Sequence, residues 1–243
     1  MTQLSPLERE RYSRQILLFG EEGQEKLKRA KVTIAGVGGL GCPAALYLTS
    51  LGVGRIRIID RDVVETSNLN RQILHWDKDI NKPKVESAYE KLREINKDVE
   101  IEKFSVEINE KNVMELLEGS DAVVDAMDNF PTRFLLNEAA VKLGIPFFHG
   151  SIYGFEGRVM TIIPGRSACL RCLFSESPPK EVFPVVGPTP GLIAMIQVTE
   201  VIKYLTGTGK LLENRYLIYD GENMSFREIK VRRNPQCPVC GKM

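Results

Sequence analysis

The feature that most constrains this chain is a glycine-rich turn between an apolar run at 32–35 and a stretch predicted to be helical. Asp60 ends the next apolar run, about 20 residues further on. This order is typical of a nucleotide-binding α/β unit, in which glycine amides approach phosphate and the acid accepts hydrogen bonds from ribose. From this pattern alone, the bound nucleotide could be NAD, FAD or ATP. The four glycines are Gly36, Gly38, Gly39 and Gly41.

Composition excludes several classes of protein. The 243 residues carry a formal net charge of +1, so neither nucleic acid nor a membrane surface is an expected partner. The N-terminus lacks the apolar centre of a signal peptide. The longest apolar stretch, 191–205, is interrupted by Gln197, Glu200 and Lys203 and is too short to cross a bilayer. We therefore predict a soluble cytoplasmic protein.

Four of the five cysteines form two Cys-x-x-Cys pairs, which in a reducing compartment indicate a four-thiolate zinc site. Four protein thiolates leave no open coordination position, so we expect the zinc to be structural. Buried or redox-active cysteines are the alternative. The predicted ligands are Cys169, Cys172, Cys237 and Cys240, with Cys42 left over.

The order of the predicted elements indicates an α/β fold of one domain, residues 1–243. N-terminal helices are expected at 1–30 and a doubly wound, mainly parallel sheet at 31–150. An antiparallel extension that holds the zinc knuckles is expected at 151–243, its last strand half exposed. A proline-rich irregular segment, 175–190, interrupts this extension.

Two cations follow the second predicted strand. Loops at the carboxyl ends of parallel strands converge on the ligand crevice, so Arg71 and Lys84 should lie beside the glycine turn. Arg offers a bidentate fork to phosphate oxygens and Lys adds a point charge. A triphosphate carries more negative charge than the bridge of a dinucleotide. The two cations therefore favour ATP.

Two acids mark the end of a buried strand near 122–126. Asp125 or Asp128 could hold Mg²⁺, which prefers one or two carboxylates together with phosphate oxygens. Asp128 is the better candidate because it lies beyond the strand end. Asn129 is predicted to cap the helix that follows at Pro131.

Together these motifs resemble the HesA/MoeB/ThiF family, the prokaryotic relatives of ubiquitin-activating enzymes. The resemblance covers about residues 5–241, and the closest member type is the adenylyltransferase of the molybdopterin synthase sulfur carrier, followed by its thiamine counterpart. The matching residues, in chain order, are Arg11-Tyr12-Ser13-Arg14-Gln15, the glycine turn with Cys42, Asp60, Ser67-Asn68-Leu69-Asn70-Arg71-Gln72, Pro83-Lys84, Asp128-Asn129 and both cysteine pairs.

The resemblance implies a reaction and a role for each matched residue. A carrier's C-terminal glycine carboxylate would attack the α-phosphorus of ATP and release pyrophosphate. Asp60 would bind ribose, Asp128 would hold Mg²⁺, and Arg14 would reach into the site of a second subunit, which implies a homodimer. The implied catalytic residues are Arg14, Arg71, Lys84 and Asp128. The implied nucleotide-binding residues are Gly36, Gly38, Gly39, Gly41, Asp60, Ser67, Asn68, Asn70, Arg71, Lys84, Asp128 and Asn129.

This chemistry agrees with a sequence that has only His75 and His149 as histidines. A carboxylate is already a nucleophile at pH 7, so no general base is needed, and we expect both histidines to be structural or on the surface. Segment 175–190, where some relatives carry a cysteine, has none here. We therefore expect the protein to stop at the acyl-adenylate, with a separate sulfurtransferase using it, and Cys42 to pack beneath the turn.

The proline-rich segment is expected to guide the carrier's Gly-Gly tail toward ATP, since prolines reduce the ordering cost of binding. A plain surface connection is the alternative. Two other functions stay open for the whole chain. One is an NAD-dependent dehydrogenase, although the C-terminal third offers no acid/base group for it. The other is a scaffold that binds nucleotide or carrier without catalysis.

Overall fold

A computed structural model of the chain describes residues 3–177 and 184–241. Its centre is one eight-stranded sheet in the order β3-β2-β1-β4-β5-β6-β7-β8. Neighbours from β3 to β5 are parallel, and those from β5 to β8 are antiparallel. The predicted doubly wound sheet with an antiparallel extension is thus confirmed. The strands are β1 Lys31–Ala35, β2 Arg55–Ile59, β3 Glu100–Phe104, β4 Ala122–Asp125, β5 Phe147–Tyr153, β6 Glu156–Ile162, β7 Arg215–Asp220 and β8 Ser225–Lys230.

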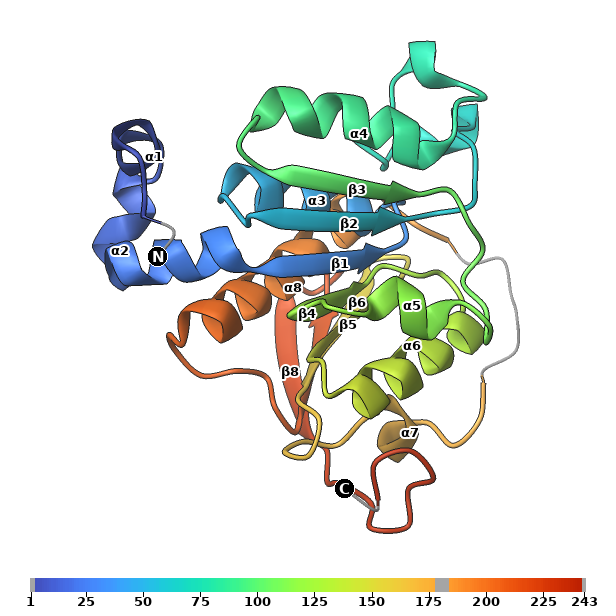
Figure 1. The fold of residues 1–243 in the computed structure, drawn as a ribbon. Helices are drawn as coiled ribbons and strands as arrows, with labels where there is room; N and C mark the ends of the chain where they lie inside the picture. The colour runs from blue at the N-terminus through green and yellow to red at the C-terminus, as the bar shows by residue number, and fades with distance from the viewer. Residues whose placement is uncertain (1–2, 178–183, 242–243) are drawn as a thin grey trace.

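Helices cover both faces of the parallel part (Figure 1). The bounds of the α-helices are α1 Pro6–Arg11, α2 Ser13–Arg29, α3 Gly41–Ser50, α4 Lys84–Ile95, α5 Val113–Leu117, α6 Phe130–Leu143, α7 Leu170–Leu173 and α8 Pro188–Thr206. Two 3₁₀ turns, η1 Thr66–Asn68 and η2 Asp77–Asp79, lie in the loop after β2.

The side chains of β1 point alternately to the two faces of the sheet, and a hydrophobic core lies on each face. Val32 and Ile34 point into the core with α3, α4 and α8, while Ala35 belongs to the core with α5 and α6. All five residues of β1 are buried, as expected for a central strand of a parallel sheet. The sequence therefore encodes a strand that packs on both faces.

The strand order reverses between β1 and β4. The chain runs from β1 outward through β2 to β3, and then returns to place β4 on the other side of β1. The loops after these two strands separate at their carboxyl ends, which is where α/β sheets bind ligands. The glycine turn follows β1 and Asp128 follows β4, so both lie at this position.

The N-terminal helices lie at the opposite end of the strands. Helix α2 leads into β1 from the amino end of the sheet, and α1 projects beyond it (Figure 1). The sequence predicts two helical pieces that divide near Phe19-Gly20, and a kink at Gly20, with φ of 72°, divides α2 there. In the described part of the chain, no helix is long and apolar enough to span a membrane.

The structure differs from the sequence prediction in three elements. The short helix α7, which contains Cys172 and has Cys169 as its N-cap, was not predicted. The sequence predicts a helix from Gly191 to about Leu205, but α8 begins at Pro188, since proline is tolerated in a first helical turn. Strand β8 is exposed along its whole length instead of on one face, because it is the last strand of the sheet and lies beyond both cores.

Candidate nucleotide site

The glycine turn is tight enough to require glycine at two positions. Gly36 has φ of +98°, and a Cβ there would lie 2.6 Å from the carbonyl oxygen of Ala126. A Cβ at Gly41 would lie 1.9 Å from the carbonyl oxygen of Gly36. The turn is therefore closed on itself and packed against the end of β4, with Gly38 and Gly39 partly exposed at its tip.

Asp60 is tied directly to this turn. Its Oδ2 accepts a hydrogen bond of 2.7 Å from the backbone N–H of Val37, and its Oδ1 accepts one of 2.8 Å from Asp62. Burial raises the pKa of Asp60, while the nearby Lys84 ammonium and these two amides act in the opposite direction. The carboxylate is held in place with acceptor capacity left on both oxygens, which fits binding of ribose hydroxyls.

Lys84 and Arg71 both lie close to this unit. Lys84 is buried at the first position of α4, and its Nζ donates to Asp62 Oδ2 at 3.1 Å. Arg71 packs its stem over Gly39, since a Cβ on that glycine would lie 3.7 Å from Arg71 Cδ. The structure thus places Arg71 against the glycine turn and Lys84 beside the loop that follows Asp60.

The polar residues around Arg71 shape its loop. Arg71 Nη1 donates to the carbonyl oxygen of Ser67 and to Asn70 Oδ1, both at 2.9 Å. Asn68 is buried, and its Oδ1 accepts from the N–H of Glu65 at 3.1 Å, which caps η1. In this structure Ser67, Asn68 and Asn70 hold the loop that presents the guanidinium. Gln72, which matches the family pattern but for which no role was predicted, lies against Gly38 with its Oε1 buried and unpartnered among the described residues.

Asp125, the last residue of β4, and Asp128, just beyond it, have different environments. Asp125 is fully buried, and its Oδ2 lies 2.7 Å from His149 Nδ1 and 3.5 Å from Arg133 Nε. Asp128 is exposed, and Asn129 Nδ2 donates to its Oδ1 at 3.2 Å. Only Asp128 therefore has a carboxylate oxygen free for a cation. Asn129 caps α6, as predicted, by accepting from the N–H of Thr132.

Sequence reasoning missed the buried cluster around His149. Gln197 Nε2 donates to the carbonyl oxygens of Asp125 and Phe148, at 2.8 Å each. The cluster joins α6, β4, β5 and α8 beneath the site. The one part of this cluster that the sequence indicated is Asp125, a buried acid at a strand end, which was considered as a Mg²⁺ ligand. The expectation that His149 has a structural position agrees with these contacts.

Arg14 is not part of this group within one chain. It is an exposed residue of the first turn of α2, at the amino end of the strands, whereas the glycine turn lies at their carboxyl end (Figure 1). The structure therefore brings together Asp60, Arg71, Lys84 and the glycines, places Asp128 near them, and leaves Arg14 apart.

Cys42 lies beneath the turn rather than facing the crevice. It is fully buried, and its thiol donates to the carbonyl oxygen of Val37 at 3.3 Å. Burial raises the pKa of this thiol to about 12, so it is uncharged at neutral pH. A buried neutral thiol is a poor nucleophile, which agrees with the packing role expected from the sequence.

A pocket opens at the same edge of the sheet. It lies between the loop after β3 and the first turns of α6, and that loop is joined to the end of β2 by an ion pair of Arg61 with Glu107. The residues that line it are Ile108, Asn109, Glu110, Lys111, Pro131, Thr132 and Leu135.

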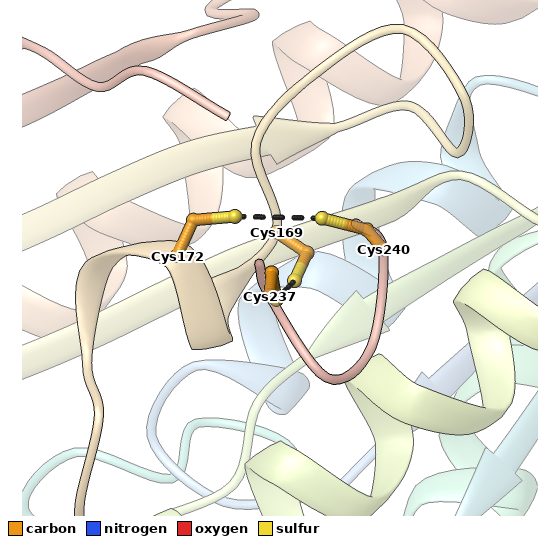
Figure 2. Close-up of side chains that lie close together, drawn as sticks. All are labelled: Cys169, Cys172, Cys237 and Cys240. Carbon is orange, nitrogen blue, oxygen red and sulfur yellow. Dashed lines mark hydrogen bonds between the residues drawn. The ribbon is translucent and has the colours of Figure 1, made fainter. Parts of the chain in front are cut away.

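The four cysteines of the two pairs converge from distant segments. Their sulfur atoms all lie within 4.8 Å of one another. The closest pairs are Cys172 with Cys240 at 3.4 Å and Cys169 with Cys237 at 3.7 Å (Figure 2). Four sulfurs around a tetrahedral ion with metal–sulfur distances near 2.3 Å would be separated by about 3.8 Å. The cluster can therefore hold a metal ion, and it ties the C-terminal turn to α7.

Comparison with models of known protein families identifies the family of this chain. The model described as "ThiF family" matches residues 12–239. The chain belongs to the ThiF family. This confirms the resemblance seen in the sequence.

Relatives of similar length carry related names. The chain is 46% identical to the SAMP-activating enzyme E1 of Haloferax volcanii, over 96% of this chain and 89% of that protein. It is 44% identical to the sulfur carrier protein adenylyltransferase of Thermus thermophilus, over 96% and 91%. A longer relative, adenylyltransferase and sulfurtransferase MOCS3 of Anopheles gambiae, is 42% identical, and the chain spans 57% of its length.

Solved structures agree with the fold. The crystal structure of E. coli MccB with ATP superposes with a TM-score of 0.86 at 25% identity, over 95% of this chain and 74% of that chain. The structure of PaaA gives a TM-score of 0.84 at 28% identity, over 96% and 76%. The mixed sheet and its helices are thus shared with a protein crystallised with ATP.

Proposed function

We propose that this protein adenylates the C-terminal glycine of a small ubiquitin-like sulfur-carrier protein that ends in Gly-Gly. The observation that carries the proposal is the joined unit of glycine turn, Asp60 and two cations at the switch point of the sheet. It occurs in a chain 44–46% identical, over nearly its whole length, to proteins named as activating enzyme and adenylyltransferase. A non-catalytic scaffold would not need this set of charges.

In the proposed reaction a carboxylate oxygen of the carrier bonds to the α-phosphorus of ATP, and the bond to pyrophosphate breaks. The attacking group is ionised at neutral pH, so the protein has to align the reactants and offset negative charge. Asp60 would hold the ribose, and the pocket beside α6 would take the base. Arg71, Lys84 and the amides of the glycine turn would face the phosphates.

The metals have separate roles in this proposal. Asp128 has a free carboxylate oxygen at the strand end and would hold Mg²⁺ together with phosphate oxygens. The ion supplies charge neutralisation on the phosphates when it is bound. The cysteine cluster would hold a structural Zn²⁺, since four thiolates leave no position for substrate.

The proposal includes a homodimer, a binding surface for the carrier and a separate sulfurtransferase. A homodimer would bring Arg14 of one subunit to the phosphates of the other, because the two positions are at opposite ends of the strands within one chain. The antiparallel strands β6–β8 would hold the carrier. A separate sulfurtransferase would use the acyl-adenylate, since segment 175–190 has no cysteine and Cys42 is buried. The proline-rich segment 175–190 would guide the carrier tail, and its residues 178–183 lie outside the described residues.

Exchange of labelled pyrophosphate into ATP tests the proposal. The substrate is a ubiquitin-like carrier from the same genome that ends in Gly-Gly, and the control is the same carrier without its last glycine. Exchange that requires the intact terminus is the expected result. Tight binding of NADH with no exchange would instead indicate a dehydrogenase.

A further inference from the structure

His75 is buried beneath the glycine turn and contacts its backbone. Its Nε2 lies 2.9 Å from the carbonyl oxygen of Val37, and its Nδ1 lies 3.0 Å from Ser87 Oγ. The residue belongs to the loop between β2 and α4, so the contact joins two segments far apart in sequence.

The partners of His75 fix its tautomer. A carbonyl oxygen only accepts, so Nε2 must carry a proton to bond Val37. Lys91 Nζ donates to Ser87 Oγ at 2.8 Å, and the single hydroxyl proton of Ser87 then has two acceptors within reach, His75 Nδ1 at 3.0 Å and the carbonyl oxygen of Leu74 at 3.4 Å, of which Nδ1 is the closer. Burial lowers the pKa of His75, and the ammonium groups of Lys84 and Lys91 act in the same direction, whereas the bond to Val37 opposes them. The imidazole is therefore neutral, with its single proton on Nε2.

This network is anchored in a buried ion pair. Lys91 also donates to Asp79 Oδ2, and the backbone N–H of Trp76 donates to the same oxygen at 3.0 Å. Burial alone would raise the pKa of Asp79, but these hydrogen bonds lower it to about 2. Asp79, Lys91 and Ser87 thus form a rigid support for the imidazole.

The contact of His75 with the Val37 carbonyl also fixes the N–H of Gly38, because both groups belong to the same planar peptide unit. In a trans peptide the C=O and the next N–H point in opposite directions. With the Val37 carbonyl held inward by His75 and by the Cys42 thiol, the N–H of Gly38 points out of the core. Among the described residues no acceptor is found for this N–H, and Gly38 is partly exposed at the tip of the turn.

We propose that His75 is a positioning residue, which holds the Val37–Gly38 peptide so that the Gly38 N–H is a preformed donor to a phosphate oxygen of ATP. The inference rests on the proposed function, because it takes ATP as the ligand of the turn. His75 itself does not touch the nucleotide. It acts by removing the conformational freedom that the flanking glycines would give this peptide.

Two matched substitutions separate positioning from packing. A Gln side chain can place its amide nitrogen where Nε2 of the imidazole lies, whereas Asn reaches only the position of Nδ1. We expect His75→Gln to bind ATP within about threefold of the wild type. We expect His75→Asn to bind about tenfold more weakly, the amount that one hydrogen bond to a charged group contributes. Equal losses in both, or none in His75→Asn, would overturn the proposal.

A measurement on the wild-type protein needs no stable variant. Labelling with ¹³C-carbonyl valine and ¹⁵N-glycine selects the amides of Gly38, Gly54 and Gly187, each of which follows a valine. The Gly54 N–H is already bonded to the carbonyl oxygen of Leu27 at 2.9 Å and serves as the internal reference. Addition of Mg-ATP should move the Gly38 resonance far more than that of Gly54. Bound ATP with an unmoved Gly38 resonance would refute this inference alone, whereas failure to bind ATP would refute the proposed function.

Discussion

The backbone N–H of Val37 donates a hydrogen bond of 2.7 Å to the carboxylate of Asp60. The bond joins the glycine turn after β1 to the acid after β2, so the proposed phosphate and ribose positions form one unit. A change at either residue should therefore affect the other.

Replacement of Asp60 tests this coupling. Asp60→Ala removes the proposed ribose acceptor and leaves the N–H groups of Val37 and Asp62 without their partner. We expect ATP binding to weaken at least about tenfold, with a loss of about 1–3 kcal/mol in the free energy of unfolding. Calorimetric titration with ATP and urea unfolding measure the two effects. Asp98→Ala, at an exposed position, is the control, and an unchanged affinity in Asp60→Ala would reject the ribose assignment.

Arg71 and Asp128 should act on the chemical step. Arg71→Ala and Asp128→Ala each remove a charge proposed to face the phosphates or Mg²⁺. Pyrophosphate exchange should fall tenfold or more in each, since such charges contribute about 2–4 kcal/mol. Arg93→Ala, a control at an exposed position of α4, should leave exchange near the wild-type rate. Near-normal exchange in both site variants would remove these two assignments.

Arg14 gives a test of the dimer as well as of catalysis. If Arg14 acts in the partner's site, Arg14→Ala and Arg71→Ala should each be nearly inactive alone. Mixed by refolding or coexpression, they should recover about a quarter of wild-type activity, because half of the dimers then contain one intact site. Recovery would be absent if Arg14 served its own subunit, and Arg14→Ala would be active by itself if Arg14 had no role. Light scattering of the wild type reports the oligomeric state independently.

The cysteine cluster should be needed for stability. Cys172→Ser removes one of four convergent sulfurs, and we expect loss of bound zinc together with a thermal midpoint lowered by about 5 °C or more. Elemental analysis and thermal unfolding measure these effects. Cys42→Ala is the matched control, since Cys42 lies outside the cluster and should leave the zinc content unchanged. A wild-type protein purified without zinc, and insensitive to a chelator, would contradict the structural role.

The two histidines should make the fold sensitive to acid. Burial lowers the pKa of both His75 and His149, although the carboxylate of Asp125 opposes this at His149. Both are neutral in the fold, so the unfolded chain binds more protons once the pH drops below about 6.5. Their contribution to stability is present above that pH and is lost as the pH falls toward the folded pKa.

Urea unfolding at pH 7.5 and 5.5 measures this loss. The free energy of unfolding should be smaller at the lower pH, and His149→Gln should reduce the difference. A stability that stays constant or rises on acidification would show that the imidazoles are not held neutral.

Much of the site could be predicted because its signals are local. The glycine spacing, the acid at the next strand end and the paired cysteines each depend on a short stretch of sequence. Arg71 and Lys84 were placed by one rule of topology, that strand ends converge in a parallel sheet. The family resemblance combined these signals with the activity.

The features of the fold and the site that were not predicted depend on contacts between segments far apart in the sequence, which no short pattern encodes. The bond from His75 to Val37 depends on the path of the whole loop between β2 and α4. The pairing of Asp125 with His149 depends on the register of β4 against β5, which places these two residues side by side. The exposure of β8 follows from its place at the end of the sheet. Sequence periodicity indicates that a strand exists but not what covers it.

The most direct test of the account is the intact mass of the carrier. The purified protein, Mg-ATP and a ubiquitin-like carrier ending in Gly-Gly are incubated with pyrophosphatase, and the carrier is analysed by mass spectrometry. We expect a carrier whose mass is increased by one AMP attached through the terminal carboxylate, and no adduct when the last glycine is removed. Bound ATP with an unmodified carrier, or an AMP group at any other position, would contradict it.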